Sequence, residues 1–168
     1  LKGHDLSFVV LAVAGGDLVS SDLIRRYSEI LDSEHGGAPF LAGYGLTEAC
    51  GPVCVSSGSD AELPEGALGK PLTGIEMCLV EPGTTKVLPN TEEGELCFFG
   101  PSLMGGYYQN PAATADVMRK HKDGRIWLHT GDVVTLDADQ NIIFKSRCKR
   151  MVKVNGYNVY PTLIENTM

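Results

Sequence analysis

The stretch LAGYGLTEACGP, residues 41 to 52, gathers groups that can bind a nucleotide. The glycines on both sides of Tyr44, Gly43 and Gly45, let the backbone approach a ligand while the ring lies flat against a base. Thr47 can donate a hydrogen bond to a phosphate, and Glu48 can bind Mg²⁺, a hard cation that prefers oxygen ligands. Taken alone, the stretch fits a second interpretation: a glycine-rich turn with a Thr-Glu pair that caps a helix.

Two more groups of residues could do chemistry. Asp132 follows a Thr-Gly turn in HTGDVV, where its carboxylate could accept both hydroxyls of a ribose, as an acidic residue does in dinucleotide sites. Aspartate is also common in turns for purely local reasons. The run RCKRMVKVNG carries four cations within seven residues, which could equally form a solvated face: Arg147, Lys149, Arg150 and Lys153.

Several other chemistries are excluded by spacing. GPSLMGG does not match GxSxG, and GALGKP lacks the spacing and the hydroxyl residue of a Walker loop. The four histidines, which are His4, His35, His121 and His129, show no metal-ligand spacing along the sequence. The sequence therefore predicts neither a serine hydrolase nor a metalloprotease.

The sequence from residue 6 to Tyr44 predicts a strand, a helix and a second strand. Residues 6 to 14 form an apolar, β-branched run that predicts a strand buried on both faces and closed by Gly15 and Gly16. Ser20 or Ser21 can cap a helix whose apolar residues form one stripe, namely Leu23, Ile24, Tyr27, Ile30 and Leu31. APFLAGYG is a second strand, so we expect a parallel pair with ligands beyond the carboxyl ends of the strands.

After about residue 58, the sequence pattern changes. From about residue 58 to 108, short strands alternate with turns, which predicts antiparallel, barrel-like β structure. QNPAATADVMRK predicts a helix capped by Asn110, two strands flank the turn 137–141, and a hairpin surrounds residues 155–156. The predicted fold is α/β plus β: the end of a parallel α/β subdomain (1–57), an antiparallel β-rich subdomain (58–147) and the start of a small α+β C-terminal domain (148–168).

Composition bounds the class of protein. Hydrophobic residues make up 43% and charged residues 21% of the 168 residues, as in a globular chain, and a net charge of −7 argues against a nucleic-acid partner. The five cysteines are odd in number and lack a CxxC pair, which predicts buried core thiols in a reducing compartment: Cys50, Cys54, Cys78, Cys97 and Cys148. No apolar run approaches the roughly 20 residues of a transmembrane helix. We therefore expect a cytoplasmic protein, and the start at Leu1 suggests a piece of a longer chain.

Five segments, taken in order, resemble the adenylate-forming superfamily, which includes acyl-CoA synthetases, luciferases and peptide-synthetase adenylation domains. They are AGGDLVSSDLIRRY, GYGLTEA, GELCFFGPSLMGGYYQNPAAT, WLHTGD and SRCKRMVKVNGYNVYPTLIE. The resemblance spans about residues 6 to 165. It implies ATP, Mg²⁺ and coenzyme A as cofactor and co-substrates, and a small carboxylic acid that is joined first to AMP and then to a thiol.

The resemblance also implies roles for individual residues. Gly15, Gly16 and Gly45 would border the nucleotide, Tyr44 would stack on the adenine, Thr47 would contact phosphate and Glu48 would hold Mg²⁺. Asp132 would bind the ribose hydroxyls with help from Arg147. Lys149 matches the hinge of a mobile C-terminal domain, and Lys153 and Gly156 match the loop that this domain brings to the site for the thiol step.

Departures from the family pattern refine the expectation. The Ser/Thr/Gly-rich phosphate loop and the C-terminal catalytic lysine of the family are missing, so we expect this chain alone to be inactive. Leu46, Lys149 and NVYP stand where peptide-synthetase domains usually carry Pro, Asp and an RIEL-like run, which favours an acyl-CoA synthetase for a fatty or related acid. A luciferase-like enzyme and a non-catalytic nucleotide-binding remnant stay open as alternatives.

Overall fold

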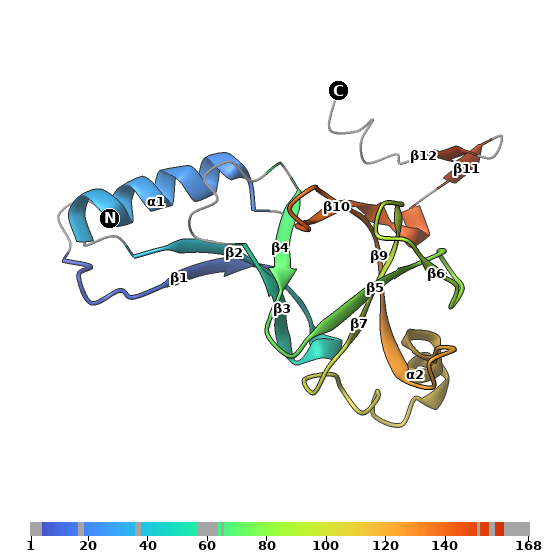
Figure 1. Ribbon diagram of the computed structural model, residues 1–168. Coiled ribbons are helices and arrows are strands. Elements are labelled where there is room, and N and C mark those ends of the chain that lie inside the picture. Colours follow the sequence, from blue (N-terminus) through green and yellow to red (C-terminus); the bar gives the residue numbers. More distant parts are fainter. Residues whose placement is uncertain are drawn as a thin grey trace.

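The computed structural model describes residues 5–16, 19–35, 38–56, 64, 66–150, 152–154 and 157–159. Within these ranges, strands β1 to β10 belong to one sheet with the order β1-β2-β3-β4-β10-β9-β7-β5-β6, and β8 pairs with β9. Figure 1 shows a small helix-covered end that continues into a strongly curled β-rich part. The prediction of α/β followed by antiparallel β structure is confirmed.

The opening unit has the predicted order of strand, helix and strand. Strand β1 (Ala12–Gly15) pairs in parallel with β2 (Phe40–Leu46), and helix α1 (Ser21–His35) connects them. The Ser20 hydroxyl accepts a hydrogen bond from the amide of Leu23, as expected of a helix cap. On the inner face of α1, Tyr27 stacks on Phe40 with ring centroids 5.1 Å apart.

Strand β1 differs from its prediction in length and burial. Only Ala12–Gly15 is extended in the ladder, and Phe8, Val10 and Val13 are exposed by 77%, 85% and 53%. The physical reason is position: β1 is the last strand of the described sheet, with β2 as its neighbour and α1 over one face. The expectation of a strand buried on both faces was therefore wrong for the described residues.

Antiparallel pairs build the β-rich part. Strand β2 leads through a 3₁₀ turn, η1 (Thr47–Ala49), into β3 (Gly51–Val55), which pairs with β4 (Ala67–Pro71). Strand β5 (Glu76–Val80) pairs with β6 (Val87–Leu88) and β7 (Gly94–Phe99), and β7 pairs with the long β9 (Ile126–Leu136). Strand β10 (Ile142–Arg147) then joins β9 to β4, so the sheet is continuous.

The start of helix α2 (Pro111–Val117) and the turn between β9 and β10 follow local sequence signals. This helix begins at Pro111, and the Asn110 side chain accepts a hydrogen bond from the amide of Ala113. The predicted helix was too long at its end, because Met118–Lys120 form the short strand β8, which pairs with β9. At the turn between β9 and β10, the Asp137 carboxylate accepts hydrogen bonds from the amides of Asp139 and Asn141.

The main core lies inside the curled sheet. It contains nine buried residues from strands that are distant in sequence, namely Ala49, Val53, Cys54, Leu79, Leu96, Phe98, Leu128, Val134 and Ile142. Cys54 and Cys97 are buried and Cys78 and Cys148 half-buried, but Cys50 is exposed, which contradicts its assignment to the core. Cys50 ends the η1 turn with a left-handed φ of 58°, so it belongs to a surface turn and not to a strand.

The C-terminal hairpin is present. After a 3₁₀ turn, η2 (Cys148–Arg150), strands β11 (Val152–Val154) and β12 (Tyr157–Val159) pair in antiparallel register. The residues of its turn lie outside the described ranges. In the part of the chain that the structure describes, no helix has the length and apolar character to cross a membrane.

A substitution at Gly69 tests how closely the backbones of β3 and β4 approach each other. The φ of Gly69 is +81°, and an added Cβ would overlap the carbonyl group of Val55. We expect Gly69→Ala to lower the free energy of unfolding by about 2 to 5 kcal/mol, because left-handed strain and a backbone clash add. Chemical denaturation measures it.

Gly74→Ala is the matched control. Gly74 has a similar φ of +87° but no heavy atom within 4 Å of an added Cβ, so only the strain of about 1 kcal/mol should appear. Equal losses in the two variants would contradict the close approach at Gly69.

Candidate functional site

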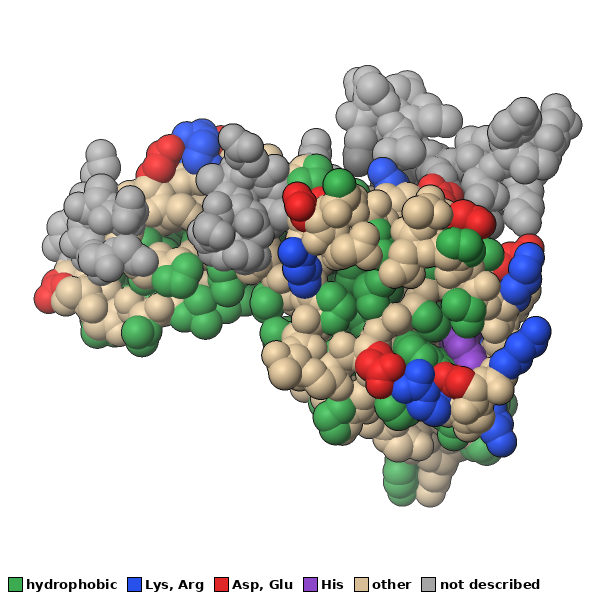
Figure 2. All heavy atoms as spheres, in the orientation of Figure 1, with side chains coloured by type: hydrophobic (Ala, Val, Ile, Leu, Met, Phe, Trp, Pro, Cys, Tyr) green, Lys and Arg blue, Asp and Glu red, His purple; other side chains and the backbone are tan. Residues whose placement is uncertain are grey.

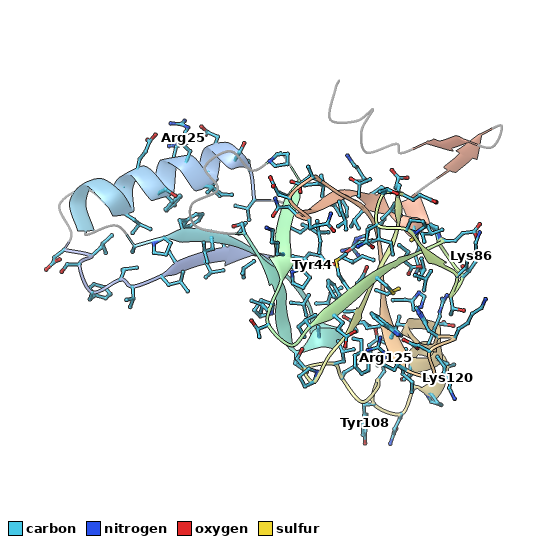
Figure 3. All side chains as sticks on the ribbon, viewed as in Figure 1. Arg25, Tyr44, Lys86, Tyr108, Lys120 and Arg125 are labelled. Carbon is cyan, nitrogen blue, oxygen red and sulfur yellow. The ribbon has the colours of Figure 1, made fainter. Side chains whose placement is uncertain are left out.

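One hollow gathers most of the predicted nucleotide-binding residues. It lies where β2, β4, β9 and β10 meet, and Figure 3 shows Tyr44 at this junction. Five residues chosen from the sequence line it, namely Gly16, Tyr44, Gly45, Asp132 and Arg147. Val19, Ala42, Gly43, Ala67, Leu68 and Phe144 complete the wall. Residues almost 90 positions apart in sequence thus meet around one cavity with an apolar wall and a few polar groups.

The central contact of the hollow joins Tyr44 to Asp132. The tyrosine hydroxyl donates a hydrogen bond of 2.6 Å to Oδ2 of the carboxylate. Burial, and next the charge of Asp132, raise the pKa of Tyr44, so its hydroxyl stays protonated and donates at neutral pH. The ring also packs at a tilt on Phe98, at 6.3 Å between centroids, which fixes its plane.

Asp132 is a buried carboxylate with one acceptor oxygen in reserve. The residue is 1% exposed, and its Oδ1 has no hydrogen-bond partner. Nε of Arg147 lies 3.2 Å from Oδ1, close enough for an ion pair but not aligned as a hydrogen bond, and the arginine side chain is 68% exposed. Burial raises the pKa of Asp132, while Tyr44 and Arg147 act against that rise. A ligand hydroxyl could therefore satisfy Oδ1.

A second carboxylate, Glu95, holds the backbone just before Asp132. The expected Thr-Gly turn is absent here, because Thr130, Gly131 and Asp132 lie inside the continuous strand β9, beside an irregularity in its pairing with β7. The carboxylate oxygens of Glu95 accept hydrogen bonds of 3.2 Å from the amides of Gly131 and Gly83. Burial alone would raise the pKa of Glu95, but His129 and these amides outweigh it and leave the pKa lowered. Gly131 has a φ of +73°, a conformation that favours glycine between Thr130 and Asp132. The sequence analysis missed Glu95, since nothing local marks it.

Thr47 and Gly15 line an adjoining hollow. It shares Gly16, Gly43 and Gly45 with the first hollow, and Thr47 and Gly15 face it from η1 and the end of β1. Gly15 and Gly43 are register partners in the parallel pair, so the two glycine clusters meet at the carboxyl ends of β1 and β2. This is the edge at which ligands bind in parallel sheets.

Glu48 lies next to these hollows in sequence but lines neither of them. Its carboxylate accepts a hydrogen bond from the hydroxyl of Tyr107, and its carbonyl oxygen accepts one from the amide of Met104. The bond to Glu48 raises the pKa of Tyr107, so the phenol remains a donor at neutral pH. Sequence reasoning missed Tyr107, although it lies in a segment that had been singled out, GPSLMGGYYQNP.

Of the predicted residues after Arg147, the structure describes the side chain of Lys149, which does not line the hollow. Lys149 lies exposed in η2. Lys153 lies in β11, but its side chain is outside the described part of the structure, and Gly156 is outside the described residues. His121 and His129, which show no metal-ligand spacing along the sequence, meet Cys97 in a buried cluster.

Comparisons with known proteins identify the family. The family model described as AMP-binding enzyme matches residues 1–108. The chain belongs to this family of AMP-binding enzymes, which confirms the resemblance to the adenylate-forming superfamily.

Relatives define the class more narrowly. The chain is 38% identical over 164 residues to a long-chain-fatty-acid–CoA ligase of Salmonella typhimurium, covering 98% of the chain and 27% of that ligase. It is 38% identical over 167 residues to a feruloyl-CoA synthase of an Amycolatopsis species, covering 99% of the chain and 32% of the synthase. The chain therefore spans about three tenths of the length of these relatives.

A solved structure matches the described fold. The o-succinylbenzoate coenzyme A synthetase of Bacillus subtilis in complex with AMP superposes with a TM-score of 0.73 at 26% identity. The match covers 93% of this chain and 30% of the synthetase.

Asp132→Asn tests the cost of the buried charge. We expect the variant to unfold at a temperature higher by about 2 to 4 °C at pH 7, which corresponds to about 1 kcal/mol, because the amide can still accept from Tyr44 and carries no buried charge. Since the folded-state pKa of Asp132 is raised above 3.8, wild type should lose stability relative to the variant as pH rises from 3.8 through the raised pKa.

Calorimetric melts between pH 4 and pH 8 measure this difference, with the exposed Asp139→Asn as control. A constant gap between wild type and Asp132→Asn over that range would contradict the raised pKa.

Proposed function

We propose that this chain is part of an ATP-dependent acyl-CoA synthetase. Such an enzyme converts a carboxylic acid and ATP to an acyl-adenylate and pyrophosphate, and then forms a thioester with coenzyme A. The observation that carries the proposal is Asp132: a carboxylate buried to 99%, held by Tyr44, with its Oδ1 unpartnered at a glycine-lined hollow.

The residues around the hollow suit AMP. Oδ1 of Asp132, which makes no hydrogen bond within the described residues and lies beside the Arg147 guanidinium, would accept hydrogen bonds from the ribose hydroxyls. The exposed guanidinium of Arg147 would remain beside the ribose, 3.2 Å from the same oxygen. The Tyr44 ring would stack on the adenine, with Gly16 leaving room for the base. Gly45 would border the nucleotide through its backbone, because an added Cβ there would point at Gly51 of β3. An open space surrounds Gly16, where no heavy atom lies within 4 Å of an added Cβ.

The residues of η1 suit a phosphate and its metal. Thr47 is exposed at the adjoining hollow, where its hydroxyl could donate to a phosphate oxygen. Glu48 shares a carboxylate oxygen with Tyr107, which orients the group and leaves the other oxygen for Mg²⁺. When bound, Mg²⁺ would neutralise charge on the phosphates during the transfer. Tyr107 then acts as a positioning residue for Glu48.

The C-terminal residues would serve the second half-reaction. We propose boundaries at residues 57/58 and 147/148, with Lys149 as the hinge and with Lys153 and Gly156 on the loop that reaches the site for the coenzyme A step. Arg147 ends β10 and Lys149 lies two residues later in η2, so the ribose site and the hinge adjoin along the chain.

The acid is proposed only as a class. Relatives named for a long-chain fatty acid and for ferulic acid share the same 38% identity with this chain, so identity does not choose between them. We propose a fatty or related carboxylic acid, with residues 42–46 forming one wall of its pocket. Turnover requires more of the parent protein than the three tenths present here, and a cytoplasmic location stays a prediction.

Titration of AMP into the chain tests the proposal. We expect binding in the millimolar range, about −4 kcal/mol, and at least a tenfold loss in Asp132→Ala, because the variant cannot accept from the ribose. The control is Asp139→Ala, an exposed aspartate in the turn at the end of the same strand pair, which should bind like wild type.

Two results would decide against parts of the proposal. Equal affinity of Asp132→Ala and wild type in isothermal calorimetry would remove Asp132 from the site. Formation of acyl-adenylate by this chain alone, followed as pyrophosphate release, would contradict the inference that it needs the rest of the parent enzyme.

A further inference from the structure

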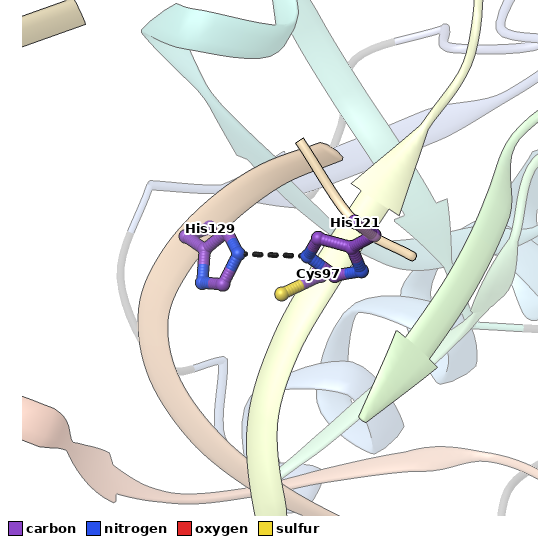
Figure 4. Close-up of side chains that lie close together, drawn as sticks. All are labelled: Cys97, His121 and His129. Atoms are coloured by element: carbon purple, nitrogen blue, oxygen red, sulfur yellow. Dashed lines mark hydrogen bonds between the residues drawn. The ribbon is translucent and has the colours of Figure 1, made fainter. Parts of the chain in front are cut away.

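A buried cluster of nitrogen and sulfur donors lies apart from the nucleotide hollow. Sγ of Cys97 and a ring nitrogen from each of His121 and His129 lie within 4.8 Å of one another. In Figure 4, the Nε2 atoms of the two imidazoles face each other, and the sulfur lies beside them. The two Nε2 atoms are 2.9 Å apart. The three residues are at most 6% exposed.

The sheet register brings a second sulfur to the same face. Cys97 of β7 is the direct partner of Cys78 on β5 and of His129 on β9. Direct partners in an antiparallel ladder point to the same side of the sheet. Sγ of Cys78 is not among the donor atoms within 4.8 Å of one another, so this residue can supply a fourth donor only by turning its side chain. Two histidines and two cysteines form a donor set typical of tetrahedral zinc.

Neighbouring groups hold the imidazoles in a ligating arrangement. Nδ1 of His129 lies 3.4 Å from Oε1 of Glu95, so a carboxylate stands behind this histidine, as it does behind many metal-bound histidines. The ring of His121 stacks on Trp127 at 5.5 Å and 19° between planes. Nδ1 of His129 makes no hydrogen bond within the described residues, so a proton on this atom would face Glu95 and leave the lone pair of Nε2 toward His121.

Without a metal, the ring nitrogens of His121 and His129 form fewer hydrogen bonds than they could. A single Nε2 proton joins the two rings, and Nδ1 of His121 has no hydrogen-bond partner among the described residues. Figure 2 shows histidine atoms at the molecular surface between basic and apolar side chains. His121, at 6%, is the most exposed member of the cluster, whereas Cys97 is 0% exposed.

We propose that Cys97, His121 and His129, with Cys78 as fourth ligand, bind Zn²⁺ or a similar borderline-soft divalent cation. Binding releases the thiol protons to solvent and moves the Nε2 proton of His121 to Nδ1, so that both Nε2 lone pairs face the metal. With Zn–N bonds of about 2.0 to 2.1 Å, tetrahedral geometry needs the two nitrogens about 3.3 Å apart, a shift of a few tenths of an ångström from 2.9 Å.

The chemistry of the donors separates this site from a magnesium site. Mg²⁺ prefers oxygen, whereas thiolate and imidazole select zinc and related transition metals. The site joins β5, β7 and the β8–β9 pair, and His129 lies three residues before Asp132. The cation would therefore stabilise the strands behind the ribose-binding segment without touching the nucleotide.

Cobalt substitution tests the proposal in the full chain, kept reduced by a phosphine. We expect Co²⁺ to give the visible bands of a tetrahedral site and a near-ultraviolet sulfur-to-cobalt charge-transfer band, and Zn²⁺ to displace it. Cys78→Ser should halve the charge-transfer intensity, and so should Cys97→Ser. The exposed Cys50→Ser is the matched control and should leave the spectrum unchanged.

Two further measurements keep the test independent of any one variant. His121→Gln, checked for folding by circular dichroism, should weaken Co²⁺ binding at least about 100-fold, and Glu95→Gln about 10- to 100-fold. Zn²⁺ should raise the melting temperature of wild type but not of His121→Gln. The proposal is overturned if wild type shows no charge-transfer band, if the band disappears in Cys50→Ser, or if Zn²⁺ leaves the melting temperature of wild type unchanged.

Discussion

The hydrogen bond between Tyr44 and Asp132 is the contact on which the candidate site depends. It connects β2, the last strand of the helix-covered unit, to β9, the longest strand of the β-rich part. A carboxylate that is 1% exposed needs a donor, and Tyr44 supplies one across a sequence separation of 88 residues. The same bond fixes the height of the Tyr44 ring at the hollow. Packing and ligand geometry are therefore set by one interaction.

The surroundings of Asp132 show how the fold arranges a buried charge for a ligand. Tyr44 satisfies one oxygen, and Arg147 approaches the other only from solvent. Glu95 fixes the preceding glycine amide, so the backbone there cannot relax to bring another donor to Oδ1. A fold selected for stability alone would satisfy this oxygen internally. Proteins leave a buried polar atom without a hydrogen bond mainly at functional sites.

The sequence predicted features whose causes are local. Asn110 and Pro111 begin α2, Ser20 caps α1, and the parallel pair follows from a strand, a helix and a strand of suitable length. The residues around the hollow were predicted from a family resemblance, and the structure brings five of them together. These predictions needed no knowledge of which strands would pair at a distance.

The features that the sequence missed depend on such pairing. Glu95 meets Gly131, and Cys97 meets His129, through the register of β7 on β9, which one sequence does not reveal. Tyr107 reaches Glu48 across 59 residues. The burial of β1 was misjudged because an apolar run does not show whether the strand ends up in the middle or at the edge of a sheet.

The position of β9 in the sheet determines which strands around the hollow open first in local unfolding. Strand β9 pairs with β7, β8 and β10, whereas β1 pairs with β2 alone in the described sheet. Amide protons of β9 should exchange with solvent only when the whole sheet opens, whereas those of β1 exchange through fraying. The carboxylate at Asp132 thus belongs to the most slowly opening unit, and the glycines at Gly15 and Gly16 to the fastest. The hollow that Gly16 and Asp132 share should therefore be rigid on its β9 side and yielding on its glycine side.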